Sequence, residues 1–399
     1  MEDLSISDYS YDLPLDRIAE FPLPHRDSSR LLVFNGEIKD SSFKHLPEFL
    51  PQTATLVLNN TKVIEARIFF TKPTGGVIEI FCLEPFAPSE MTQSLEHSSP
   101  VQWRCLIGGA SKWKAGQVLQ KDITIHGQTV SLEAWYISKQ PEDFIIEFRW
   151  DTTHHFADVI HAAGNIPLPP YIKRQVEQKD SERYQTIFAK QEGSVAAPTA
   201  ALHFTEEVFS ALGQKNITPH YITLNVGAGT FKPMKAETIS GHQMHGEHFT
   251  VTKETLKALL AAETLIAVGT TTLRTLESLY WLAIKYKEKN AADWNLSQWE
   301  AYDIQATLSY KQSIEILLEH LENNNLNELH CSTSILIRPG YQFKSADALI
   351  TNFHQPRSTL ILLVAAFVGE DWRKIYDHAL ANNYRFLSYG DSSLLWRKK

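Results

Sequence analysis

Cysteine is scarce in this chain of 399 residues, which contains Cys82, Cys105 and Cys331 and no other. Three widely spaced cysteines exclude a disulfide framework and a four-cysteine zinc site, and they are typical of a reducing compartment. The longest apolar run, residues 360–368, reaches about half of the roughly 20 residues that a transmembrane helix needs. The first residues are acidic and not apolar, so we expect no targeting peptide, no membrane span and a cytoplasmic location.

Positive charge is not in excess either. The chain has 38 Lys and Arg residues against 46 Asp and Glu residues, which gives a formal net charge of -8. This balance argues against a polyanion-binding protein whose whole surface is basic, so any contact with nucleic acid must be local. Hydrophobic residues make up 43% of the chain, which is enough for more than one compact unit with its own buried core.

Residues 63–150 consist of short β-branched and aromatic runs separated by turn residues. Runs at this spacing, without a helical period, predict a small antiparallel β-barrel or sandwich that forms a separate domain. The expected strands are residues 63–70, 77–83, 101–107, 118–119, 123–125, 130–137 and 144–150.

The remaining residues, 1–62 and 151–399, alternate short apolar runs with amphipathic helices, which predicts a mainly parallel sheet or barrel. Thr205 and Thr252 are expected to be helix N-caps. We interpret the polar residues 279–331 as a helical excursion on the surface. The predicted fold is therefore α/β, with a barrel-like α/β catalytic domain into which a small antiparallel β-barrel domain is inserted. The expected strands of the α/β domain are residues 221–226, 265–268, 334–337 and 348–350.

Glycine and small polar residues follow four apolar runs of the α/β part, at residues 227–231, 269–272, 351–354 and 389–391. Loops that leave the carboxyl ends of strands converge on one rim in α/β folds, so we expect these loops to build one ligand site. Neither glycine-containing loop has the spacing of a dinucleotide fingerprint or a phosphate-binding loop. Ordinary helix capping is the alternative interpretation of each loop by itself.

His203 lies between a run of small residues, 193–199, and the expected helix start at Thr205. The positive end of a helix disfavours an imidazolium, so we expect His203 to be neutral and able to accept a proton at pH 7. A histidine that holds the loop through hydrogen bonds fits the same spacing.

A second cluster, His242, His245, Glu247 and His248, follows Gly241. Histidine and carboxylate are zinc ligands, but no helical period presents these residues as in metalloproteases. We therefore favour a hydrogen-bonding cluster that supplies acid and base groups to a polar substrate, and we expect no metal. A zinc site and a solvated loop are the alternatives.

Two short basic segments are candidates for RNA binding. Arg26 and Arg30 lie in the first, and Tyr171, Lys173 and Arg174 in the second. Arginine and lysine can contact phosphates while a tyrosine stacks on a base. A solvated basic surface is the alternative.

Several short motifs occur in the order that is typical of one family. They are residues 11–14, 26–27, 29–32, 59–61, 167–172, 184–186, 193–199, 202–204, 226–231, 242, 244–245, 247, 267–271, 274, 339–341, 351–354, 358–360 and 388–391. Together they span nearly the whole chain and resemble the S-adenosylmethionine:tRNA ribosyltransferase-isomerase family of queuosine biosynthesis. The resemblance implies a barrel-like α/β large domain with an inserted β-barrel, in agreement with the pattern above.

The resemblance also implies a reaction. Members of the family move the ribosyl part of S-adenosylmethionine onto the aminomethyl group of 7-aminomethyl-7-deazaguanine at the tRNA wobble position. The products are epoxyqueuosine, adenine and methionine. S-adenosylmethionine is thus expected as a co-substrate and the anticodon stem-loop of tRNA as the partner. The protein itself is expected to be a monomer.

Roles follow from the chemistry of this reaction. The sulfonium acidifies the ribose C5′ protons, so a neutral base can remove one, and adenine then leaves if an acid protonates it. We assign the base to His203. His242 or His245 would assist the departure of adenine, with Glu247 orienting them, and Asp391 would take a proton from the attacking amine.

Binding of S-adenosylmethionine is assigned to the loops that follow the strands. Asn352 and His354 would hold the adenosine side. Tyr389 or Phe231 would face the sulfonium in a cation–π contact worth about 1–2 kcal/mol when desolvated. The residues assigned to the methionine and ribose parts are Gly227, Gly229, Thr230, Gly269 and Thr270.

Ala201, Asn225 and Gln355 depart from the family pattern, which leaves alternatives open. A protein of the same descent could bind RNA without catalysis, or could use S-adenosylmethionine with another acceptor. A metallohydrolase built on the histidine cluster is a third possibility.

Overall fold

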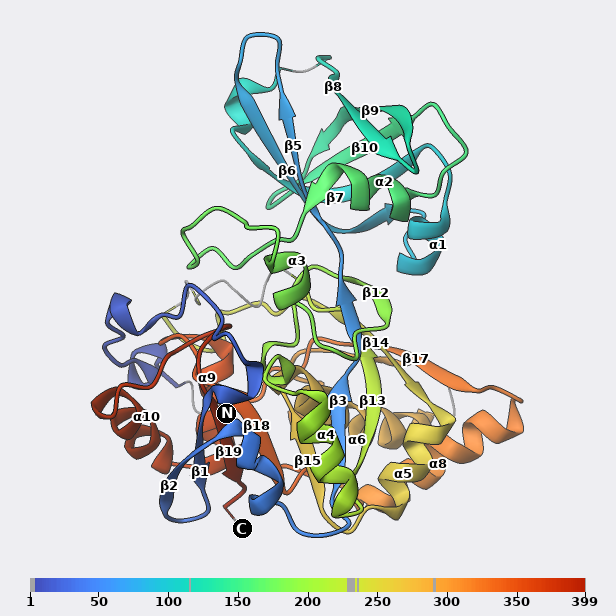
Figure 1. The fold of residues 1–399 in the computed structure, drawn as a ribbon. Coiled ribbons are helices and arrows are strands. Elements are labelled where there is room, and N and C mark those ends of the chain that lie inside the picture. Colours follow the sequence, from blue (N-terminus) through green and yellow to red (C-terminus); the bar gives the residue numbers. More distant parts are fainter. Residues whose placement is uncertain (1–3, 115, 228–233, 235–236, 290–291, 399) are drawn as a thin grey trace.

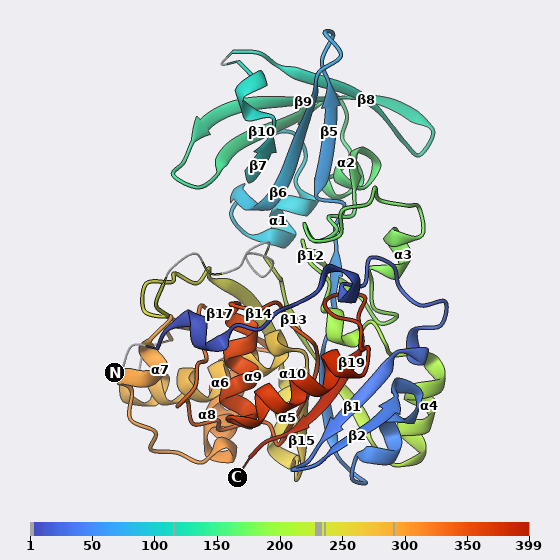
Figure 2. The same cartoon turned by 90° about the vertical axis from the view of Figure 1, so that its left-hand side faces the viewer.

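The computed structural model describes the chain except for residues 1–3, 115, 228–233, 235–236, 290–291 and 399. Two separate sheets organise these residues, one of ten strands and one of seven. Figures 1 and 2 show the seven-stranded sheet set apart from the larger unit, which holds both ends of the chain. The structure is thus of mixed α/β class.

The ten-stranded sheet has its parallel strands in the middle. β13, β3, β15 and β18 run parallel to one another, and antiparallel neighbours lie on both sides of them. Within the described residues, the outermost strands, β16 and β2, do not pair with each other. In order across the sheet, the strands are β16 (Asn295–Leu296), β17 (Glu328–Thr333), β14 (Glu247–Thr252), β13 (Thr218–Leu224), β3 (Thr55–Asn59), β15 (Leu265–Val268), β18 (Ala348–Asn352), β19 (Ser392–Trp396), β1 (Arg30–Phe34) and β2 (Ile38–Ser42).

Helices cover both faces of this sheet because its strands are apolar on both sides. On β3, Val57 packs into the core with α6, whereas Leu56 and Leu58 point to the opposite face and pack into the core with α4. The helices of this unit are α3 (Asp180–Arg183), α4 (Glu206–Gln214), α5 (Lys253–Ala261), α6 (Thr270–Lys289), α7 (Glu300–Asp303), α8 (Tyr310–Asn323), α9 (Thr359–Val368) and α10 (Asp371–Ala381), with short 3-10 helices at Ile6–Tyr9, Leu15–Arg17, Arg26–Ser28, Phe43–Phe49 and Thr199–Ala201.

The seven-stranded sheet is antiparallel and curled, and it has its own core. The helix α2 packs into that core, and β11 pairs with β5, so residues 156–165 belong to this unit although they follow residue 150. A two-stranded parallel ladder, β4 (Thr61–Val63) with β12 (Gln191–Ser194), lies below it in Figure 1. The elements are β11 (Gly164–Asn165), β5 (Arg67–Thr71), β6 (Val77–Ala87), β7 (Val101–Gly108), β10 (Phe144–Trp150), β9 (Gln128–Lys139), β8 (Leu119–Ile125), α1 (Met91–Glu96), α2 (Phe156–Ala163) and the 3-10 helix Ala110–Lys112.

Most expected elements are confirmed, including the N-caps: Thr205 accepts a hydrogen bond from the backbone of Val208, and Thr252 one from Thr255. The strand expected at 334–337 is wrong. Those residues are buried but irregular, and the strand is β17, immediately before them. The apolar side chains of this segment are buried because they pack into two different hydrophobic cores. A run of apolar residues looks the same in the sequence whether it forms a strand or a buried irregular segment.

Residues 279–331 are not peripheral. The second half of α6 is largely buried, and β17 is an internal strand of the large sheet. This stretch therefore forms part of the main core. The part of the chain that the structure describes contains no helix both long and apolar enough to span a membrane.

Candidate active site

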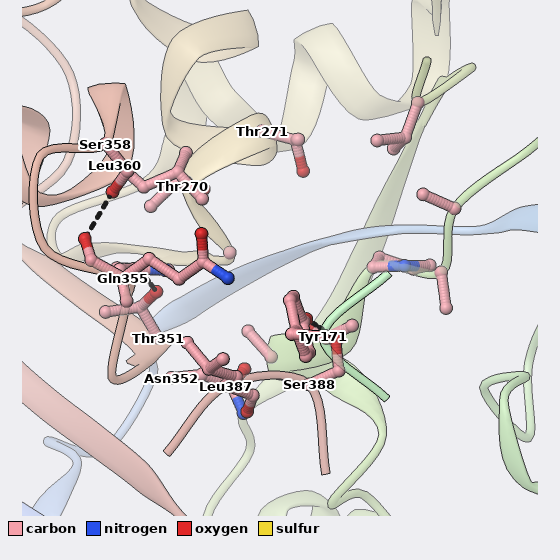
Figure 3. Close-up of a pocket in the computed structure, with 18 residues that line it drawn as sticks. Tyr171, Thr270, Thr271, Thr351, Asn352, Gln355, Ser358, Leu360, Leu387 and Ser388 are labelled. Atoms are coloured by element: carbon pink, nitrogen blue, oxygen red, sulfur yellow. Dashed lines mark hydrogen bonds between the residues drawn. The ribbon is translucent and has the colours of Figure 1, made fainter. Parts of the chain in front are cut away.

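A pocket of about 700 Å3 lies at the carboxyl ends of the central parallel strands. Val226 follows β13, Gly269 and Thr270 follow β15, and Thr351 to Gln355 end and follow β18, so the predicted convergence of these loops is found. Figure 3 shows the side chains gathered around this space. The lining residues are Tyr171, 196–200, Val226, 269–271, Thr351, Asn352, His354, Gln355, Ser358, Leu360, Leu387 and Ser388.

The fourth expected loop reaches the pocket for a different reason. β19 runs antiparallel to β18, so the segment before β19 lies where β18 ends. Leu387 and Ser388 therefore line the pocket, and the hydroxyls of Ser388 and Tyr171 lie 2.5 Å apart. Tyr171 was expected to bind RNA, but in this structure it closes one side of the pocket.

Asn352 connects the pocket to His203. Its Nδ2 donates to the backbone oxygen of Leu387 at 3.2 Å and lies 3.3 Å from Nε2 of His203. Because Nδ2 is a donor, Nε2 of His203 is the acceptor. Oδ1 of Asn352 is buried and has no partner among the described atoms. It is therefore available to accept a hydrogen bond from a ligand in the pocket.

Both buried histidines of this region are neutral at pH 7. Burial lowers the pKa of His203 to about 3, and the positive charges of Arg385 and Arg26 act in the same direction. Burial also lowers the pKa of His354 to about 3, and its Nε2 lies 2.9 Å from the Thr351 hydroxyl. His354 lines the pocket, whereas His203 lies behind Asn352.

A second pocket, of about 270 Å3, adjoins the first and shares Ser388 with it. His203 and Tyr389 line this pocket and not the first one. The Tyr389 hydroxyl donates to Asp180 at 3.0 Å. The complete lining is Pro22, Leu23, Arg26, Ser29, Arg183, Leu202, His203, Arg385, Ser388 and Tyr389.

Two carboxylates expected to take part in catalysis have partners within the protein. Glu247 is buried on β14 and forms an ion pair with Arg274 of α6. Asp391 is buried and accepts hydrogen bonds from the backbone amides of Arg30 at 2.9 Å and Arg385 at 2.8 Å. Neither lines a pocket described above.

The histidine cluster does not line these pockets either. His245 is exposed, and His242 is partly buried, with its backbone oxygen bound by Gln298 at 2.7 Å. Burial lowers the pKa of His242, and the nearby His245 adds to this. Within the described residues, no group of three or more His, Cys, Asp or Glu is arranged to hold a metal ion.

The other expected RNA-binding residues are spread over the surface. Arg30 stacks on Tyr384 at 3.7 Å and lies 3.5 Å from Asp40. Arg174 forms a bidentate ion pair with Asp180 at 2.6 and 2.7 Å. Lys173 is exposed. Arg26 is the member of this set that enters a pocket.

Some of the expected site residues fall outside the described residues, namely Gly229, Thr230 and Phe231. Gly227 is described and follows the pocket residue Val226. Of the three departures from the family pattern, Gln355 lines the first pocket, and Figure 3 shows its amide pointing into it. Ala201 and Asn225 do not line it.

Sequence reasoning missed Arg183 and Arg385, which join Arg26 around the second pocket. Arg183 lies in a polar segment and Arg385 between Tyr384 and Phe386, and nothing in the local pattern marks either of them as a site residue. The small residues 196–200 could have been included, because the sequence already indicated that they allow close approach.

Known proteins resemble the chain over almost its full length. A family model described as "Queuosine biosynthesis protein" matches residues 6–395. An S-adenosylmethionine:tRNA ribosyltransferase-isomerase from Magnetococcus marinus is 37% identical, covering 98% of this chain and 94% of the relative. A protein of the same name from an Azoarcus species is 36% identical, covering 99% and 98%. A crystal structure of an S-adenosylmethionine tRNA ribosyltransferase from Thermotoga maritima is 27% identical, covers 98% of this chain and 100% of that one, and has a TM-score of 0.46. By the family match and these relatives, the chain belongs to the queuosine biosynthesis protein family.

Proposed function

We propose that this protein is an S-adenosylmethionine:tRNA ribosyltransferase-isomerase that modifies tRNA in queuosine biosynthesis. The observation that carries the proposal is that six distant segments with the family motifs contribute residues to one pocket. The pocket combines apolar walls with a few directed polar groups, which suits a nucleoside with a charged substituent.

S-adenosylmethionine, the co-substrate, is proposed to occupy this pocket. Thr270 and Thr271 line the pocket in the first turn of α6, where backbone amides have no partner within the helix and can bind a carboxylate. The Gly269 amide already donates to the backbone oxygen of Ile350 at 2.8 Å, so Gly269 contributes space and not a donor. Asn352 offers its unpartnered Oδ1 to a hydroxyl or amino group. Small residues at 196–200 leave room for the ligand.

The base is proposed to be His354 and no longer His203. His354 is neutral and lines the pocket, so it can reach a ligand directly. Nε2 of each histidine has a hydrogen-bond partner, Thr351 for His354 and Asn352 for His203, so the difference is that the His203 ring lies outside the first pocket. We therefore assign His203 to positioning Asn352, with Oδ1 directed to the ligand.

Adenine release tests the function. The protein would be incubated with labelled S-adenosylmethionine and an anticodon stem-loop carrying 7-aminomethyl-7-deazaguanine. Adenine and methionine should appear with the stem-loop and not without it. Stem-loop binding without adenine release would favour a non-catalytic RNA-binding protein, and release with another acceptor would favour a different transferase.

Replacements test the histidine roles. His354→Ala should abolish turnover with near-normal binding of S-adenosylmethionine, because it removes the proton acceptor. His203→Ala should mainly raise KM, because it releases Asn352. The opposite pattern would return the base to His203.

We further propose that the curled seven-stranded unit is an inserted domain that ends near residue 165. Its separate core supports this division. A cytoplasmic, monomeric enzyme that needs no metal is the expected form.

A further inference from the structure

The second pocket has a strongly cationic wall. Arg26 and Arg183 form no ion pair among the described residues, and they bind backbone oxygens instead. Arg26 donates to Leu202 at 3.1 Å and to Glu182 at 2.9 Å, and Arg183 donates to Leu23 at 2.7 Å. These bonds fix the guanidinium groups, but neutral carbonyls do not cancel their charge.

Only part of the remaining charge is compensated. Arg385 lies 3.7 Å from Asp391 and donates to the backbone oxygen of Phe21 at 3.3 Å. Asp180 lies under Tyr389, but it is already paired with Arg174. Three arginines around a pocket of about 270 Å3 therefore leave a net positive field.

Two further groups indicate a ligand with oxygen atoms. The hydroxyl of Ser29 lines this pocket, is buried at 1% exposure and has no hydrogen-bond partner among the described atoms. Nε of Arg183 is likewise buried without a partner. A buried polar group without a partner is costly, and an anionic oxygen would satisfy both donors.

We propose that this second pocket binds an anionic oxygen group and that this group is a backbone phosphate of the RNA substrate. The proposal rests on the proposed function. Ser388 belongs to both pockets, and Asn352 of the first contacts His203 of the second. A nucleotide whose base reaches S-adenosylmethionine at the mouth of the first pocket would thus have its phosphate next to the second.

The rim favours RNA over the carboxylate of S-adenosylmethionine as the source of the anion. Phe21, beside the lining residue Pro22, is 44% exposed. Arg174 stacks on its ring at 4.3 Å, and the Lys179 ammonium lies 5.3 Å from it. An exposed aromatic ring with flanking cations is a common platform for single-stranded RNA bases.

The test replaces phosphates of the modified anticodon stem-loop, one at a time, by neutral methylphosphonates. Binding is measured by fluorescence anisotropy for the wild type, Arg183→Gln and a control, Arg373→Gln, which removes the same charge from an exposed position on α10. One methylphosphonate should weaken binding to the wild type and the control about tenfold. The same replacement should have no further effect on binding to Arg183→Gln. For this variant, the slope of the logarithm of the binding constant against the logarithm of the salt concentration should be smaller in magnitude by about 1.

Ser29→Ala is a second variant that should still fold, because the hydroxyl it removes makes no hydrogen bond within the part of the chain that the structure describes. It should weaken RNA binding severalfold and suppress the effect of the same methylphosphonate. Binding of S-adenosylmethionine should be unchanged in all variants. Weaker S-adenosylmethionine binding with unchanged RNA binding would assign the pocket to the methionine carboxylate and overturn the proposal. The proposal would also be overturned if the loss of binding caused by Arg183→Gln and the loss caused by each methylphosphonate were additive at every phosphate. The proposed function is decided separately, by the adenine-release assay with the wild type.

Discussion

The buried ion pair between Glu247 and Arg274 gives a sharp test of whether Glu247 is structural or catalytic. Both side chains are 7% exposed, and Nε of Arg274 donates to Ile335 at 3.1 Å. Nη2 of Arg274 already lacks a partner among the described atoms. Glu247 is therefore the main compensation for the Arg274 charge.

Replacing Glu247 by Gln leaves that guanidinium buried without a counter-charge. Breaking a buried pair in this way costs about 3–5 kcal/mol of unfolding free energy. We expect about 3 kcal/mol, the lower end, because the amide oxygen of Gln can still accept a hydrogen bond. Urea unfolding followed by circular dichroism measures this loss.

The matched control is Glu247→Leu with Arg274→Met, which removes both charges and should recover most of the stability. Adenine release per folded molecule should change little in either protein, because neither residue lines the pocket. A loss of turnover in Glu247→Gln with unfolding free energy retained would refute the structural role and restore the catalytic one.

Three further predictions follow from the pocket. His203 and His354 have pKa values of about 3 in the folded state, below the unfolded value of 6.5, so the unfolded chain binds more protons between these pH values and stability falls as pH falls. Each histidine should lower the free energy of unfolding by about 2 kcal/mol between pH 7 and pH 5. A free energy of unfolding, measured in urea, that stays constant over this range would contradict the burial of these histidines. Gly269 has a φ of +92°, so Gly269→Ala should lose about 1–2 kcal/mol through backbone strain, while Gly227→Ala should lose less; equal losses in thermal unfolding would refute this. Asn352→Ala should weaken S-adenosylmethionine binding about tenfold in calorimetry, and unchanged affinity would show that Oδ1 does not face the ligand.

Local pattern was sufficient for much of the fold. The strands of the seven-stranded sheet follow alternation that each strand carries within itself, and β10 has the bounds expected. The strands β17, β1 and β3 were not among those predicted from the sequence. Exposed and buried residues alternate along β17, and β1 and β3 are short apolar runs, so each carries a local strand pattern. What local pattern does not supply is the order of these strands in the sheet, which depends on their neighbours.

The candidate site divides in the same way. The loops after β15 and β18 could be placed from the sequence, because residues that follow parallel strands share one edge wherever the chain has such strands. By contrast, the sequence could not show that Glu247 is neutralised by Arg274 or that Asp391 binds two backbone amides. The sequence identifies a carboxylate residue but does not show whether another part of the chain supplies a partner for it.

The sequence by itself determined the family, the α/β class and the strand ends that carry the first pocket, since these depend on local pattern and on motif order. Only the tertiary structure decided that His354 lines the pocket while His203 lies behind Asn352. It also brought Arg26, Arg183 and Arg385 together from three distant segments. The physical reason is that packing between distant segments determines which side chains line the same cavity and add to the same electrostatic potential. No single segment of the sequence contains that information.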